Sequence, residues 1–270
     1  YPERVFNMWT EQELYALHAA IFHRKSVRKY NSQGLDSATL DDIRKQVSKL
    51  QPLFPTAKIA FRFLSASEVK GRVSPGANYL AVYAPHEARA YTNAGFMLQQ
   101  MDLWFSANGL RSLWHGLISP RAPFATADGL PFAFMLTFGV PAEPLHRKSE
   151  HDFTRKDVKD ITDTPVLYPL LRAVRLAPSA TNRQPWFFTG TADEIRCYRA
   201  KVVGNPLLRL MLGDVQYLDD GIALCHLRLA SFAQHKTLAF YEEAAVPSLD
   251  TNYDYVCTAR LRTETQEENL

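Results

Sequence analysis

The sequence predicts an α+β protein with a mostly antiparallel sheet, built from two diverged copies of one helix–strand–strand–helix unit. Apolar runs with helical spacing alternate with short apolar runs that hairpin-length gaps separate. In addition, the second half of the chain repeats the first at an offset of 126 residues, the difference between Leu176 and Leu50. We therefore expect two repeats, 1–140 and 141–270, intertwined as one globular unit.

The first half predicts three helices and four strands. Thr10 is the expected N-cap of an amphipathic helix over 11–22. A long helix over 85–108 should end at Gly109, because glycine is preferred just beyond a helix C-terminus. The remaining elements are a helix from Asp36 or Ser37 to about Leu50 and strands over 57–64, 78–84, 110–119 and 132–138.

The second half follows the same plan after a polar connector over 139–155. A helix over 165–176 should stop before Pro178, since proline lacks the N–H and disfavours helix at the preceding residue. A long helix is expected over 215–234. The predicted strands of this half are 186–189, 194–199, 237–241 and 253–261.

The repeat extends through both halves. The same offset pairs identical residues in the loops, in the first strand of each half and in the long helices: Pro52 with Pro178, Phe61 with Phe187, Ala66 with Ala192, Glu68 with Glu194, Tyr91 with Tyr217, Gly95 with Gly221, Leu98 with Leu224, Leu103 with Leu229 and Ala107 with Ala233. Val69-Lys70 also aligns conservatively with Ile195-Arg196. Small residues in both long helices would allow close packing. The chain thus looks like a fused symmetric dimer, a pseudo-two-fold arrangement.

Two polar loops distinguish the copies. The segment 175–186 is rich in hydrogen-bonding groups and lies between two prolines, which suits a planar polar ligand, although a helix C-cap and turn is the alternative. The segment 23–30 is rich in basic residues, and a solvated helix end is its alternative. Each copy keeps one loop and lacks the other, so one complete site should remain across the seam between the copies.

Both loops resemble elements of the nitroreductase family of flavoproteins. Segment 24–30 reads Arg-Lys-Ser-Val-Arg-Lys-Tyr, against the family's Arg-Arg-Ser-x-Arg-x-Phe. Segment 177–186 reads Ala-Pro-Ser-Ala-Thr-Asn-Arg-Gln-Pro-Trp, against Ala-Pro-Ser-x-x-Asn-x-Gln-Pro-Trp. Their wide separation resembles the single-chain, tandem-repeat branch of the Thermotoga type. The family's Gly-x-Gly-Thr-x-Trp-x-Gly pattern is altered here to Gly-Leu-Arg-Ser-Leu-Trp-His-Gly over 109–116.

The resemblance implies a nitroreductase-like fold and bound FMN. Arg24, with Ser26 and Lys25, would hold the phosphate, which carries close to two negative charges. Arg28 would lie at the N1/O2 edge of the flavin, and Arg147 would also meet the phosphate. The other positions that the resemblance assigns to the cofactor are the strand residues Leu117 and Ile118 and the loop residues Pro178, Ser179, Ala180 and Asn182. Gln184 would hold this loop.

Composition sets the remaining expectations. The net charge of +3 does not favour nucleic acid, and no apolar run is long enough to span a membrane. Three cysteines far apart, without metal-binding spacing, favour reduced thiols in the cytoplasm and predict no metal. No residue is assigned as an indispensable acid or base. Either a monomeric pseudo-dimer or a homodimer is compatible with the fusion.

The expected function is that of an FMN-dependent NAD(P)H oxidoreductase. Hydride would pass from NAD(P)H to flavin N5 and on to a nitroaromatic or quinone-like acceptor, so the cofactor carries the chemistry. No dinucleotide-binding glycine pattern is present, so the nicotinamide would dock transiently over the flavin. The alternatives are a flavin-binding protein without turnover, or a specialised flavin chemistry such as dehalogenation.

Overall fold

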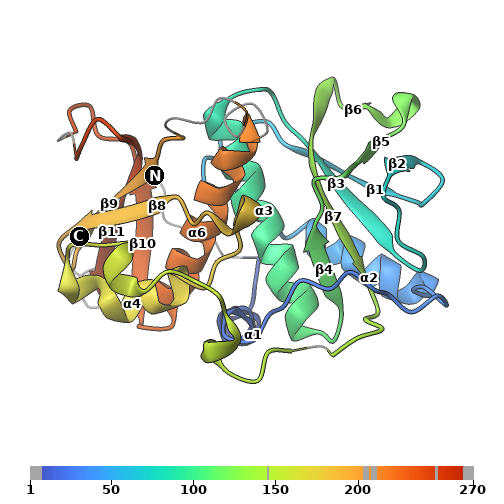
Figure 1. Cartoon of the computed structure of the whole chain (residues 1–270), viewed down its shortest axis with the longest axis horizontal. Helices are drawn as coiled ribbons and strands as arrows, with labels where there is room; N and C mark the ends of the chain where they lie inside the picture. The colour runs from blue at the N-terminus through green and yellow to red at the C-terminus, as the bar shows by residue number, and fades with distance from the viewer. Residues whose placement is uncertain (1–7, 145, 203–206, 208–211, 247–248, 264–270) are drawn as a thin grey trace.

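Two long helices form the centre of the protein. The computed structural model describes residues 8–144, 146–202, 207, 212–246 and 249–263. Helices α3 (Ala88–Ala107) and α6 (Val215–Phe232) lie side by side in the middle of the molecule (Figure 1). Both are buried over most of their length, which explains why their apolar residues are not confined to one face.

Two glycines set the distance between these helices. A Cβ atom on Gly95 would lie 2.1 Å from the carbonyl oxygen of Leu218, and one on Gly221 would lie 1.9 Å from that of Thr92. Thr92 and Leu218 are themselves 126 residues apart, so the two contacts are equivalent: each glycine meets the counterpart of the residue that the other glycine meets. The predicted close packing at the glycines is therefore confirmed, and the contact has the reciprocity of a two-fold interface.

The strands form two main antiparallel sheets, one on each side of the helix pair, instead of one central sheet. One sheet has the order β1-β3-β7-β4, with the short strand β6 also paired to β7, and the other has the order β10-β11-β9-β8. Their strands are β1 (Ala60–Leu64), β3 (Asn78–Tyr83), β4 (Arg111–Trp114), β6 (Thr126–Ala127), β7 (Leu130–Gly139), β8 (Trp186–Gly190), β9 (Glu194–Ala200), β10 (Lys236–Tyr241) and β11 (Tyr253–Thr263).

The sheets have the same connectivity when the second is read from β8. In each half, the first strand pairs with the second strand of its sheet (β1 with β3, β8 with β9), and the long helix follows. The last strand, β7 or β11, lies between that second strand and the strand that follows the helix, β4 or β10. This shared order supports the proposed division into repeats 1–140 and 141–270. The pairing of 68–70 with 194–196 is wrong, because β2 (Val69–Gly71) belongs to an excursion between β1 and β3, whereas β9 is the counterpart of β3.

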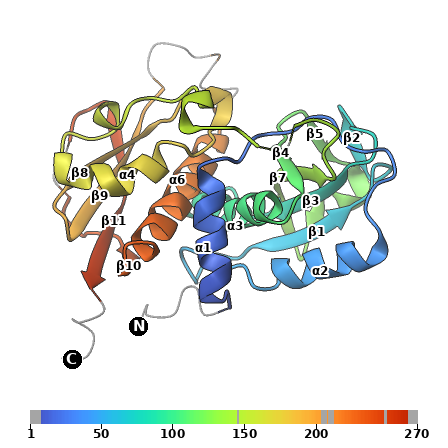
Figure 2. The same cartoon turned by 90° about the horizontal axis from the view of Figure 1, so that it is seen from below.

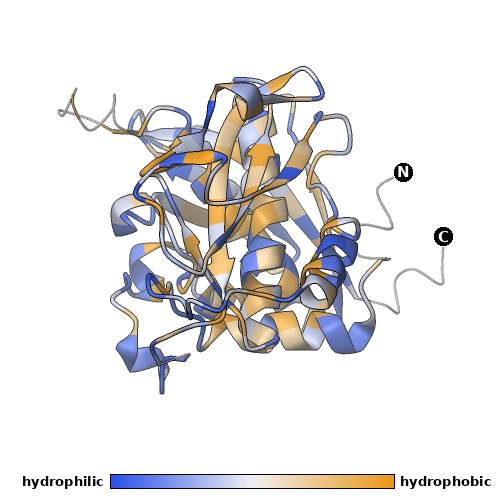
Figure 3. Ribbon diagram, turned by 90° about the vertical axis from the view of Figure 1, so that its right-hand side faces the viewer, coloured by the Kyte–Doolittle hydropathy of each residue, from blue (hydrophilic) through white to orange (hydrophobic). Residues whose placement is uncertain are grey.

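Shorter helices cover the remaining faces. Helix α1 (Glu11–Ile21) is capped by Thr10, as predicted, and packs across both long helices (Figure 2). Helix α2 (Ser37–Val47) covers the first sheet, and α4 (Tyr168–Val174) packs on α6. Figure 3 shows hydrophobic residues concentrated on the central helices and strands. Within the described ranges, every helix is too short or too polar to cross a lipid bilayer.

One predicted strand is interrupted. The segment predicted over 110–119 divides into β4 and β5 (Ile118–Pro120), because the chain turns at Gly116 and leaves β7 to pair with β2. This turn matters for the site, since it exposes Gly116 and Leu117.

Candidate functional site

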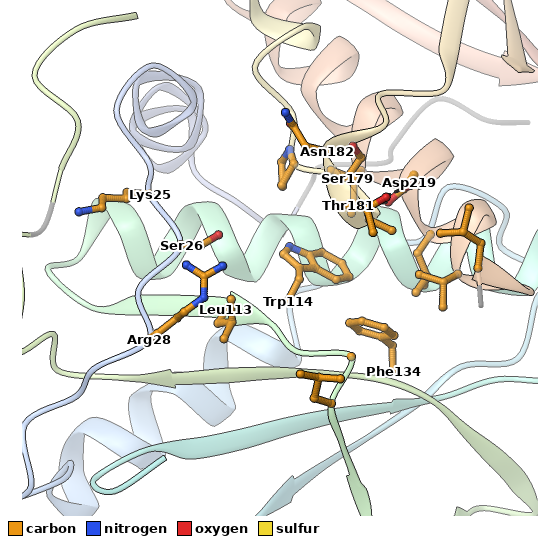
Figure 4. A pocket seen from close by; sticks show the side chains of 18 of the residues that line it. Lys25, Ser26, Arg28, Leu113, Trp114, Phe134, Ser179, Thr181, Asn182 and Asp219 are labelled. Carbon is orange, nitrogen blue, oxygen red and sulfur yellow. Dashed lines mark hydrogen bonds between the residues drawn. The ribbon is translucent and has the colours of Figure 1, made fainter. Parts of the chain in front are cut away.

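Both polar loops line one cavity of about 710 Å³ between the two halves. The segment after α1 contributes Lys25, Ser26 and Arg28, and the segment after α4 contributes residues 178–182. Figure 4 shows them on opposite sides, with Trp114 between them. The remaining lining residues come from β4 and the turn that follows it, from β7, from the connector, from α6 and from the segment just before α6: Leu113, Trp114, Gly116, Leu117, Phe134, Arg147, Arg155, Leu212, Val215, Leu218, Asp219 and Ile222.

The lining of the cavity is strongly basic. Lys25, Arg28, Arg147 and Arg155 all line it, and among the described residues none of these four takes part in an ion pair. Burial, and then the nearby cations Arg24, Arg147 and Arg175, lower the pKa of Arg155 to about 10. Mutual repulsion of this kind is relieved by an anion, and Ser26 adds a hydroxyl donor.

Arg24 does not line the cavity, which corrects its expected place on the phosphate. Its side chain is buried, and its Nε lies 2.8 Å from Oδ2 of Asp102 on α3. From this position it donates to Oγ of Ser26 at 3.0 Å, and its own carbonyl oxygen accepts a hydrogen bond from Arg147. Arg24 thus supports two lining residues, Ser26 and Arg147, without lining the cavity itself.

Ile118 does not line the cavity either. It is buried within β5, where it pairs with Gly71 of β2. Its neighbour Leu117 does line the cavity and is 68% exposed. The turn at Gly116 separates the two residues, because Leu117 remains outside the β2–β5 pairing that buries Ile118.

The loop 178–184 is held in an unusual backbone conformation. Thr181, Asn182 and Gln184 all have positive φ angles, of 51°, 58° and 51°, a region that costs energy for residues other than glycine. Ser179 Oγ accepts a hydrogen bond from the backbone N–H of Gln184 at 2.9 Å. The Gln184 side chain is buried and accepts from the Lys156 backbone N–H at 2.8 Å, which confirms that it holds the loop.

Apolar groups form the wall between the two loops. Trp114 and Phe134 lie with their ring centroids 5.8 Å apart, beside Leu113 and the exposed Leu117. The indole Nε1 of Trp114 is buried, and no described residue accepts its hydrogen. The wall therefore suits a flat, largely apolar ring.

Asp219 of α6 is the acidic residue of the cavity lining. Its two carboxyl oxygens lie 2.9 and 3.2 Å from the Ala180 backbone nitrogen, which donates to them. Burial raises the pKa of Asp219 to about 8. Asp219 is not among the residues predicted from the sequence, although the offset of 126 aligns it with Asn93, a polar residue at the same place in the first long helix.

The structure thus brings together nine of the eleven residues predicted from the sequence. These are Lys25, Ser26, Arg28, Leu117, Arg147, Pro178, Ser179, Ala180 and Asn182. Besides Asp219, the residues that were missed are mainly apolar side chains of α6 and of the strands, which carry no motif. No cluster of potential metal ligands was found among the residues that the structure describes.

Comparisons with known proteins agree on one family. The family model described as "Putative TM nitroreductase" matches residues 16–231. A solved structure from Thermotoga maritima, described as a "putative nitroreductase", is 22% identical with a TM-score of 0.61, and the match covers 91% of this chain and 92% of that one. This likeness shows the fold.

Shorter solved structures resemble only part of the chain. A nitroreductase family protein from Clostridium difficile is 15% identical with a TM-score of 0.39, covering 54% of this chain and 95% of its own. A structure from Exiguobacterium sibiricum, described as a "putative nitroreductase in complex with FMN", is 13% identical with a TM-score of 0.32, covering 53% of this chain and 95% of its own. No curated protein matched the sequence.

Proposed function

Since the chain belongs to the family described as "Putative TM nitroreductase", we propose that it is an FMN-dependent NAD(P)H oxidoreductase that reduces nitroaromatic or quinone-like acceptors. The observation that carries this proposal is the cavity itself. Four cations that form no ion pair with any described residue line it, together with an apolar wall of Trp114, Phe134 and Leu113. This combination fits a phosphate joined to a planar heterocycle.

The residues of the cavity divide between the parts of FMN. Lys25, Ser26, Arg147 and Arg155 would hold the phosphate through charge and hydrogen bonds. Trp114 and Phe134 would line the ring, with the loop 178–182 facing it from the other half of the chain. Bound there, FMN would supply reversible hydride storage, which amino-acid side chains lack.

Arg28 has a separate role in this proposal. Arg28 and Asn182 lie on opposite sides of the cavity, and the Arg28 side chain is exposed. A fixed cation near the ring would stabilise the negative charge that accumulates on reduction. The exposed side chain of Leu117, beside Gly116, would provide an apolar surface for the nicotinamide and the acceptor. These two would bind there one after the other.

We also propose a cytoplasmic location. Cys197, Cys225 and Cys257 are buried and free, and burial raises the pKa of the Cys225 thiol. Buried thiols that stay reduced suit a reducing compartment. Because the fusion already supplies both halves of the cavity, a monomer would be sufficient for activity, and a homodimer remains compatible with this proposal.

The direct test is the visible absorption spectrum of the purified chain after reconstitution with FMN, followed by anaerobic NADPH and then NADH. Flavin bands that bleach would support the proposed oxidoreductase. Bands that persist with both donors would favour a flavin-binding protein without turnover. A chain that stays colourless in saturating FMN would contradict the proposal.

Removal of one cation should weaken FMN binding. Arg147→Ala is expected to raise the FMN Kd by about 10- to 100-fold, because a charge-assisted hydrogen bond contributes about 1.5–3 kcal/mol. Flavin fluorescence titration measures the change, and the effect should diminish in high salt. Lys29→Ala is the matched control, since Lys29 is exposed and does not line the cavity. Equal affinities for the two variants would remove Arg147 from the phosphate site.

A further inference from the structure

Asp219 is a buried carboxyl group in the wall of the cavity. The residue is only 3% exposed, and it accepts hydrogen bonds from the Ala180 backbone N–H. Figure 4 shows it beside Thr181, on the side of the cavity opposite the basic residues Lys25 and Arg28. A charged carboxylate in such a place would need more donors than one N–H provides.

The first half of the chain contains the same arrangement with an amide. Asn93, the residue 126 positions before Asp219, accepts hydrogen bonds at Oδ1 from the backbone N–H groups of Leu53 and Phe54, at 2.6 and 3.0 Å. Phe54 is in turn 126 positions before Ala180. Asn93 Nδ2 also donates to the Phe54 carbonyl oxygen at 3.0 Å. None of these three first-half residues lines the cavity.

The internal comparison separates two roles of this position. Fixing the loop to the long helix requires only a neutral hydrogen-bonding side chain, as Asn93 demonstrates. A carboxyl group is present only in the copy whose loop lines the cavity. Since a buried carboxyl destabilises the fold at neutral pH more than an amide does, structure alone gives no reason for it. The reason must lie in the chemistry of the cavity.

We propose that Asp219 is the acid of this cavity and gives its proton to the acceptor that is reduced there. The proposal rests on the proposed oxidoreductase function. The hydride comes ultimately from NAD(P)H and carries two electrons and one proton. A quinone that accepts it needs one further proton to become a hydroquinone. The O–H bond of Asp219 breaks, an O–H bond forms on the quinone oxygen, and water later returns a proton to the carboxylate.

The electrostatic surroundings favour the neutral acid. Burial is the largest cause of the raised pKa of Asp219, and Asp220, next along α6, raises it further, although Asp220 is paired with Arg199 of β9 at 2.5 Å. The Ala180 backbone N–H and, to a smaller extent, Arg183 lower the pKa of Asp219, but burial outweighs them. The adjoining stretch of α3, from Thr92 to Phe96, contains no ionisable side chain. Asp219 therefore keeps its proton near neutral pH, as a general acid must.

The first readout is stability against pH, which needs no cofactor. The pKa of Asp219 is about 8 in the folded chain and about 3.9 in the unfolded chain. Between these pH values the unfolded chain binds fewer protons than the folded chain, so the stability of the wild type should fall as pH rises through this range. Asp219→Asn removes this loss. We expect its Tm to exceed the wild-type value by on the order of 10 °C at pH 8, and by much less at pH 5.

The second readout separates proton delivery from electron delivery. Wild type and Asp219→Asn are loaded with FMN and reduced by NADPH. Each is then reoxidised either by a quinone or by ferricyanide, an acceptor that takes electrons without a proton. Loss of the acid is expected to slow quinone reduction about 100-fold and to leave ferricyanide reduction unchanged. Asp219→Glu, which keeps a carboxyl group, should recover part of the quinone rate.

Asn93→Asp is the matched control. It places a carboxyl group at the equivalent position away from the cavity, so it should lower stability with the same dependence on pH and leave the ratio of quinone to ferricyanide rates unchanged. An unaltered ratio in Asp219→Asn overturns the acid role alone. A wild-type chain that does not bind FMN, or that reduces neither acceptor, overturns the proposed function and the acid role together.

Discussion

Gly221→Ala is expected to destabilise the protein by at least about 3 kcal/mol, although alanine is the better helix former. The new Cβ atom would lie 1.9 Å from the Thr92 carbonyl oxygen and 2.5 Å from the Phe96 nitrogen. Both are backbone atoms of α3, so no rotamer change can relieve the clash and the two central helices must separate. Chemical denaturation measures the loss of unfolding free energy.

Gly116→Ala provides the control for this prediction. A Cβ atom there would meet only the Phe134 ring, at 3.7 Å, an ordinary van der Waals distance. Gly116 lies in the turn between β4 and β5, away from the helix contact, so Gly116→Ala tests the addition of a methyl group without the clash. If Gly221→Ala were as stable as wild type, the close packing of α3 and α6 would be wrong.

Asp102→Asn should lower the free energy of unfolding by about 3–5 kcal/mol, because it leaves the buried Arg24 guanidinium without a counter-charge. Both side chains of this ion pair are only 2% exposed, and Ser112 Oγ donates to the other carboxyl oxygen at 2.5 Å. Since Arg24 supports Ser26 and Arg147, the FMN affinity should fall as well. Thermal unfolding and flavin titration measure the two effects.

An exposed ion pair supplies the comparison. Asp41 and Arg44 lie 2.6 Å apart but are 64% and 52% exposed, so Asp41→Asn should change stability by less than about 1 kcal/mol. The double substitution Arg24→Met with Asp102→Leu should restore much of the stability lost in Asp102→Asn, without restoring FMN affinity. Similar losses for Asp102→Asn and Asp41→Asn would contradict a supporting role for the buried pair.

Local patterns in the sequence predicted most elements within a few residues. Thr10 and Gly109 marked a helix start and a helix end correctly, because capping and left-handed residues act over a single turn. The short strands β2 and β6 were missed, since they are too brief to show alternation. The break between β4 and β5 was also missed, because it depends on β2 pairing with β5 and not on the residues at the turn.

The sequence likewise located both sides of the cavity. The basic segment after α1 and the polar loop before β8 carried recognisable residue patterns, and the offset of 126 indicated that they come from complementary copies. Asp219 and the apolar wall carried no such pattern. Their contribution follows from burial and from the pairing of the two halves, which local composition does not encode.

The sequence by itself determined the fold family, the two loops and the glycines of the central helices. Only the tertiary structure decided which side chains face the cavity. Arg24 and Arg28 belong to the same basic segment, yet Arg24 turns inward because Asp102, far along the chain, supplies the charge that burial requires. Ile118 and Leu117 are adjacent, yet only Leu117 reaches the cavity. In each case the direction of a side chain depends on a packing partner that is distant in sequence.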